Sequence, residues 1–203
     1  MSQKQMEKRT YQIDFLVEKR DAEPPVLTGH AAVFNIVGDG VWFREKVAPG
    51  AFRDSISKDD IRLLFNHDAN YVLGRNKAGT LTLEEDDRGL FIKGVPPDTQ
   101  FARDLLISVE RGDITQMSFG FETLKDSWEK SEGNEPDLRT LEKVKLWDVS
   151  LVTYPFYKDT DVAVRSHEAW VRTFSSPEPL TARLLRRQHL IRTKNVWKKF
   201  QGG

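Results

Sequence analysis

A serine stands on the polar face of a short apolar segment, ITQMSFGF at residues 114–121. Read as a strand with a period of two, the segment puts its methionine and both phenylalanines on one face, which is typical of a buried core. Ser118 lies on the other face, between Gln116 and Gly120. A small hydroxyl beside a glycine has two interpretations here: a shallow, solvent-facing sheet surface, or a nucleophile with room for a substrate backbone above Gly120.

Hydrolysis by a serine requires a base within hydrogen-bond reach of the hydroxyl and a third group that orients the base. His67 closes the apolar run IRLLFN, so a core strand tethers its backbone. Asp148 lies within LWDVSLV, where a carboxylate is costly to bury without a partner. Spacing alone does not bring either residue to Ser118, and a structural histidine and a structural aspartate are the commoner interpretations.

The composition excludes several other chemistries. The 203 residues include no cysteine, and the four histidines show neither an HExxH motif nor another paired metal-ligand spacing. We therefore expect no metal and no cofactor. The proportions of 38% hydrophobic and 31% charged residues are typical of a soluble globular protein. The sequence has no apolar run of about 18 residues and no apolar signal-peptide segment, so we expect no membrane association.

The zero net charge conceals an asymmetry between the body of the chain and its tail. Residues 1–165 carry 23 Lys and Arg against 29 Asp and Glu, whereas residues 166–203 carry 8 against 2. The tail, whose segment LTARLLRRQHLIRTKNVWKKF has a helical pattern, favours a polyanionic or acidic partner, although a solvated tail explains it equally well. We expect domains at 1–166 and 167–203.

Short strands are the main elements expected around the candidate residues. Strands are predicted over residues 10–20, 27–36, 41–47, 61–68, 81–85, 90–96, 114–124, 139–155 and 160–165. A short helix is predicted over 51–58, and a longer one over 98–113, capped by Asp98 or Thr99 and ended by Gly112. Residues 125–137 are expected to form a loop. This pattern favours a small barrel wrapped by helices over a parallel βαβ array.

Several motifs in order give the chain a family resemblance. They are GHAAVFN (29–35), WFREKVAPGAF (42–52), LLFNHD followed by LGR (73–75), DDRGLFI, RGDITQMSFGF (111–121) and LWDVSLVTYPFYKDTDVAVRS (146–166). From about residue 10 to 166, the chain resembles the prohead proteases of tailed bacteriophages, the head maturation serine peptidases of the Hong Kong 97 type. The motifs are ordinary individually but specific in this order.

The resemblance implies a fold and a set of site residues. The fold would be α+β but mainly β, a closed antiparallel barrel of about seven strands surrounded by helices, as in the herpesvirus assemblin proteases. By motif, His67 would be the base, Ser118 the nucleophile and Asp148 the third member. Many relatives have Glu where this chain has Asp148. The oxyanion donors stay open between backbone amides at the barrel rim and Arg75.

The resemblance also implies a function. The chain would be a serine endopeptidase that cuts the major capsid protein, its scaffolding segment and then itself, inside the immature prohead in the bacterial host cytoplasm. Assemblin relatives suggest a homodimer. The alternative is a catalytically inactive scaffold or capsid-binding protein with the same barrel, for which Asp148 is the only hint. Nucleic-acid binding through the tail ranks last, because the body is acidic.

Overall fold

The computed structural model describes residues 6–12, 16–18, 24–39, 43–133, 135–154, 167–171 and 173. The chain divides into two compact units, Met1–Val164 and Arg165–Gly203. In the second unit, residues 167–171 are helical, and the backbone N–H of Thr173 donates to the carbonyl of Trp170 over 2.9 Å. The sheets, the helices and the candidate site described below all belong to the first unit.

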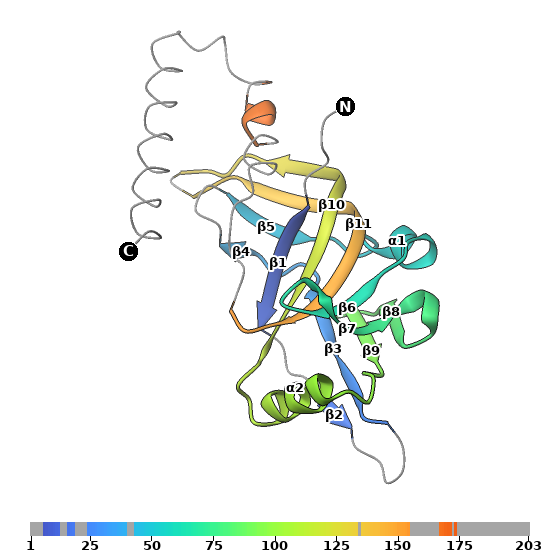
Figure 1. Ribbon diagram of the computed structural model, residues 1–203. Helices are drawn as coiled ribbons and strands as arrows, with labels where there is room; N and C mark the ends of the chain where they lie inside the picture. The colour runs from blue at the N-terminus through green and yellow to red at the C-terminus, as the bar shows by residue number, and fades with distance from the viewer. Residues whose placement is uncertain are drawn as a thin grey trace, which may run out of the picture. The chain divides into compact units, whose positions relative to one another are not determined.

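The larger sheet is built on two long strands, β10 (Gln116–Glu129) and β11 (Leu138–Val152). They pair antiparallel and curve side by side through the first unit (Figure 1). The other strands of this seven-stranded sheet are β1 (Glu7–Gln12), β4 (Gly38–Asp39), β5 (Arg44–Val47), β6 (Arg62–Phe65) and β7 (Asp68–Arg75). β1 lies beside β10, whereas β5 and β6 run parallel to β11, one along each half of it.

The smaller sheet is antiparallel and has four strands. Their order is β2 (Leu16–Glu18), β3 (Val26–Val33), β9 (Gly89–Gly94) and β8 (Leu81–Glu85). The helices are α1 (Arg53–Lys58), a single 3-10 turn η1 (Asn76–Ala78) and α2 (Gln100–Glu110). α2 begins as predicted, because the Thr99 hydroxyl accepts from the backbone N–H of Ala102, and Gly112 follows its end with a φ of 78°.

Both sheets contribute to one hydrophobic core. Phe119 and Val149 of the larger sheet and Leu90 and Ile92 of the smaller sheet are fully buried. Phe52, which precedes α1, packs edge to face against Phe119 with ring centroids 5.2 Å apart. Since neighbouring residues of a strand face opposite ways, this core fixes one side of β10 and leaves the other side to the polar residues between the phenylalanines.

The prediction of a closed antiparallel β-barrel of about seven strands surrounded by helices is wrong, although the mainly β content is confirmed. The two sheets have open strand orders, β1-β10-β11-β5-β4 and β2-β3-β9-β8, whereas a barrel needs its first and last strands to pair. The parallel pairing of β5 and β6 with β11 also makes the larger sheet mixed. In the described part of the first unit, two short α-helices do not surround the sheets.

Other predicted elements have different bounds in the structure. The strand predicted over 10–20 becomes β1 and β2, which belong to different sheets. β10 continues past Leu124 to Glu129, because its pairing with β11 extends to Leu138. The strand predicted over 160–165 and the basic helix of the tail lie outside the described residues. Among the residues that are described, no helix has the length and apolar character needed to cross a membrane.

Candidate active site

Strand β10 presents Ser118 on the face opposite the core. Its neighbours in the sequence, Met117 and Phe119, are both buried in the core, so the serine side chain points the other way. Across the sheet, Ser118 stands directly opposite Thr10 of β1 and Ser150 of β11. Ser118 itself is 0% exposed. The Ser118 side chain is therefore fully enclosed by its neighbours.

The pairing of β10 with β11 is interrupted near the middle of both strands. Gly120 pairs with Asp148, but the next residue, Phe121, pairs with Leu146. Trp147 is therefore an extra residue on β11, a β-bulge. An extra residue shifts the alternation of side chains along a strand by one position.

The bulge decides where Asp148 points. Leu146 faces the core before the bulge, and Val149 faces the core after it. Without the extra residue, position 148 would continue the alternation of Leu146 and point into the core. The bulge instead turns the Asp148 carboxylate to the same face as Ser118.

Gly120 provides the space that this carboxylate occupies. A Cβ built on Gly120 would lie 2.3 Å from Oδ2 of Asp148, far inside van der Waals contact. Any larger residue at this position would therefore displace the carboxylate. The expectation that Gly120 leaves space for a substrate backbone is corrected accordingly, since the Asp148 side chain fills this space.

His67 comes from a tight turn between β6 and β7. Asn66 and His67 have φ values of 52° and 57°, which is the conformation of both central residues in a two-residue type I′ hairpin turn. The Asn66 backbone N–H donates to the carbonyl of Leu151 over 2.8 Å, and its side-chain Oδ1 accepts from the backbone N–H of Thr153 over 3.0 Å. The turn is thus fixed to the end of β11.

The structure brings the three predicted site residues together in a chain of hydrogen bonds. His67 Nδ1 lies 2.6 Å from Asp148 Oδ1, and His67 Nε2 lies 2.7 Å from Ser118 Oγ. An ionised carboxylate only accepts, so Nδ1 carries the proton and Nε2 presents its lone pair to the serine hydroxyl. This arrangement can remove a proton from Ser118 and stabilise the imidazolium that results.

Comparison with known proteins places the chain in a family. A family model described as caudovirus prohead serine protease matches residues 13–172. The chain belongs to this family. A prohead protease of Enterobacteria phage HK97 is 27% identical over 167 residues, which cover 75% of this chain and 69% of the phage protein. No solved structure gives a significant match. The resemblance inferred from the motifs is confirmed, and membership supports a serine peptidase of phage capsid maturation.

Sequence reasoning missed a fourth polar residue at this site. Ser150 Oγ donates to Asp148 Oδ1 over 2.6 Å, and Ser150 is fully buried. The signal was present in the segment LWDVSLV, because residues two apart on a strand share a face. Ser150 therefore had to lie on the same side of the sheet as Asp148.

The arginine considered as an oxyanion donor is bound elsewhere. Arg75 donates to both carboxylate oxygens of Asp60, with both distances 2.7 Å. This hydrogen bonding, opposed only in part by desolvation and helped by Arg62, lowers the pKa of Asp60 to about 2. The guanidinium of Arg75 is thus committed to an exposed ion pair with Asp60.

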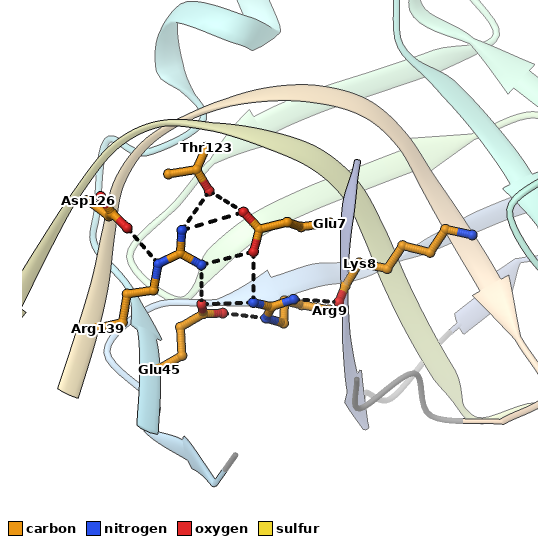
Figure 2. Close-up of polar contacts among 7 residues, drawn as sticks. All are labelled: Glu7, Lys8, Arg9, Glu45, Thr123, Asp126 and Arg139. Carbon is orange, nitrogen blue, oxygen red and sulfur yellow. Dashed lines mark hydrogen bonds and ion pairs between the residues drawn. The ribbon is translucent and has the colours of Figure 1, made fainter. Parts of the chain in front are cut away.

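A second group of charged residues, buried or partly buried, lies farther along the same strands and is called the ionic cluster. It consists of Glu7, Arg9, Glu45, Asp126 and Arg139, joined by the Thr123 hydroxyl (Figure 2). Arg139 is 1% exposed and contacts Glu7 at 2.9 Å, Glu45 at 3.0 Å and Asp126 at 2.7 Å. The cluster joins β1, β5, β10 and β11.

Mutual attraction outweighs burial within the ionic cluster. Burial alone would raise the pKa of Glu7, but the charge of Arg139 and its hydrogen bond lower that pKa overall. Burial alone would lower the pKa of Arg139, yet Glu45 and Glu7 raise it. Glu7 and Arg139 are therefore both charged in the folded protein. Each of these buried ions has an oppositely charged partner, which compensates for the cost of removing it from water.

Proposed function

We propose that this chain is a serine endopeptidase in which Ser118 is the nucleophile, His67 the general base and Asp148 the orienting carboxylate. The hydrogen-bond chain from Asp148 through His67 to Ser118 carries this proposal. The family supports the reaction class, and the geometry supplies a nucleophile with a base in contact and a third group on that base.

The contacts suggest the order of proton transfers. As Ser118 Oγ attacks the scissile carbonyl carbon, its proton moves to His67 Nε2. The imidazolium, stabilised by Asp148, then protonates the leaving amine as the peptide C–N bond breaks, which leaves an acyl group on Ser118. Water attacks this ester with His67 again as base, and the proton returns to Ser118 when the carboxylic acid product leaves.

The aspartate at position 148 is compatible with catalysis, although many relatives have Glu there. An Asp side chain is one methylene shorter, so it has to approach the imidazole more closely. The bulge at Trp147 and the open space over Gly120 let it do so, and Asp148 Oδ1 reaches His67 Nδ1 at 2.6 Å. This contact favours an active peptidase over a catalytically inactive scaffold with the same fold.

The proposed substrates are the major capsid protein with its scaffolding segment and, afterwards, the protease itself. The family description is the support for a capsid substrate. The proposed place of action is the immature prohead in the bacterial host cytoplasm, where the protease is proposed to act as a homodimer. The domain of residues 1–166 would hold the site.

The basic tail, residues 167–203, is proposed to hold the protease to the acidic interior during assembly. Its 8 basic and 2 acidic residues beyond position 165 favour such contacts. Deletion of residues 171–203 should then abolish packaging of the protease into proheads and spare hydrolysis of peptides. Normal incorporation of the truncated chain would contradict this role for the tail.

Co-expression with the capsid protein of the same phage tests the proposed reaction. Intact masses of both proteins are compared for the wild type, Ser118→Ala and the control Ser127→Ala, which changes a serine on the same strand outside the site. The wild type and the control should shorten the capsid protein, and Ser118→Ala should not. Equal masses in all three cultures would make Ser118 an ordinary strand serine and leave the inactive scaffold as the better interpretation.

A further inference from the structure

Ser150 occupies the position across the ladder from the nucleophile. It pairs directly with Ser118 on the neighbouring strand, so both hydroxyl groups lie on one face of the sheet. Both residues are 0% exposed. A buried hydroxyl needs a hydrogen-bond partner, and the partner of Ser150 is the carboxylate of Asp148.

Two donors meet on one carboxylate oxygen. Asp148 Oδ1 accepts from Ser150 Oγ over 2.6 Å and from His67 Nδ1 over 2.6 Å. Rotation of an Asp carboxyl about its last side-chain bond is only weakly restricted by intrinsic preference, so contacts have to select its orientation. The donor from β11 holds Oδ1 where the imidazole of His67 meets it.

We propose that Ser150 is a positioning residue for the hydrolytic reaction, acting through Asp148 on His67. This inference rests on the proposed function, because it assigns Ser150 a role only if the His67 imidazole works as the base. Ser150 does not itself contact His67 or Ser118 through any hydrogen bond within the described residues. Its whole contribution to the rate therefore passes through the carboxylate.

A double-mutant cycle separates this role from a structural one. Ser150→Ala should lower kcat for capsid-protein hydrolysis about 10-fold, the rate equivalent of one hydrogen bond to a charged group, with KM nearly unchanged. In an Asp148→Ala background, the same Ser150→Ala substitution should cost nothing further. Ser150→Thr, which keeps the hydroxyl, should restore most of kcat.

Thr123 offers a matched control. Its hydroxyl also donates to a carboxylate, since Thr123 Oγ1 lies 2.6 Å from Glu7 Oε1, but that carboxylate belongs to the ionic cluster and not to the site. Thr123→Ala should lower stability, because Glu7 loses this hydrogen bond, while kcat per folded molecule stays near the wild-type value.

Different results would reject the proposed function and the positioning role of Ser150. Continued cleavage by Ser118→Ala would reject the proposed nucleophile, and with it any reason to assign a role to Ser150. With Ser118→Ala inactive, an unchanged kcat in Ser150→Ala would overturn the positioning role alone. An equal loss of kcat from Ser150→Ala in the wild-type and Asp148→Ala backgrounds would also overturn it.

Discussion

The candidate active site and the ionic cluster both hold carboxylates on or beside strands β10 and β11, but they use them differently. Each guanidinium of the ionic cluster contacts two or more carboxylates, and Arg139 alone contacts three. The site residues instead form a linear chain of hydrogen bonds, from Ser150 to Asp148, then to His67 and Ser118. Several partners hold each charge of the ionic cluster in place, whereas in the site the His67 imidazole has the Asp148 carboxylate at Nδ1 and the Ser118 hydroxyl at Nε2.

The difference shows how one pair of strands serves both stability and chemistry. In the ionic cluster the pKa of Glu7 is lowered and that of Arg139 is raised, so neither exchanges its proton at neutral pH. The site contains an imidazole, which can both accept and donate a proton. Substitutions in the ionic cluster should therefore change stability, and substitutions in the site should change the rate.

The largest effect is expected from Asp148→Asn. The amide of asparagine can donate to Nδ1 of His67 and so favour the tautomer that has its proton on Nε2, facing Ser118. We expect kcat to fall about 10⁴-fold, as happens when such a carboxylate is replaced elsewhere. The free energy of unfolding should change by about 1 kcal/mol or less. Steady-state kinetics on purified capsid protein measure the first quantity, and a kcat within 10-fold of the wild type would remove Asp148 from the mechanism.

Arg139→Met should have the opposite effect to Asp148→Asn, with a large loss of stability and little change in kcat. Removal of this guanidinium leaves the carboxylates of Glu7, Glu45 and Asp126 without their shared partner, which should cost about 3–5 kcal/mol of folding free energy. Urea unfolding followed by tryptophan fluorescence measures this loss, and kcat per folded molecule should stay within a few-fold. Arg103→Met, which removes a surface ion pair with Asp98, is the control. A similar stability for both variants would mean that the ionic cluster does not stabilise the sheet.

Gly120→Ala tests whether the site depends on the space over Gly120. The added methyl would fall 2.3 Å from Asp148 Oδ2, so the carboxylate has to move. A displacement of this kind should lower kcat about 100-fold. Gly38→Ala is a suitable control, because a Cβ there meets nothing closer than 3.8 Å. If Gly120→Ala kept full activity, the close fit of the carboxylate over Gly120 would have no functional importance.

The smallest effect is the pH dependence of stability due to Glu7. Its pKa in the folded protein lies below the ordinary value of 4.5, so at acidic pH the unfolded chain binds more protons at this position. The stabilisation from Glu7 is fully present above about pH 4.5 and is lost as the pH falls through the lower, folded-state pKa. The urea midpoint should therefore fall less steeply on acidification in Glu7→Gln than in the wild type. Parallel curves would contradict this contribution.

The sequence predicted which side of a strand each site residue faces better than it predicted which strands pair. The period of two around Ser118 correctly put Phe119 in the core and the hydroxyl on the other side. The bulge is also visible in the local sequence, because the core residues Leu146 and Val149 are three positions apart and so break the period of two. Reading that break would have predicted the direction of Asp148.

Contacts between residues far apart in the chain are not visible in the local sequence pattern. The ionic cluster joins Glu7, Glu45 and Arg139, which lie on three strands far apart in the chain, and each looks locally like a surface charge of an alternating strand. The open sheets were missed for a related reason. The local pattern predicted a long strand over 139–155, but it does not reveal that β5 pairs along one half of β11 and β6 along the other, both in parallel.

Active-site labelling tests the central claim, that Ser118 is made nucleophilic by His67, most directly. A wild-type preparation that cleaves the capsid protein is treated with a fluorophosphonate, and the modified peptide is mapped by mass spectrometry. We predict one adduct per chain, on Ser118, which is absent in Ser118→Ala and forms far more slowly in His67→Ala. An adduct on another serine, or a rate that is the same without His67, would contradict the account.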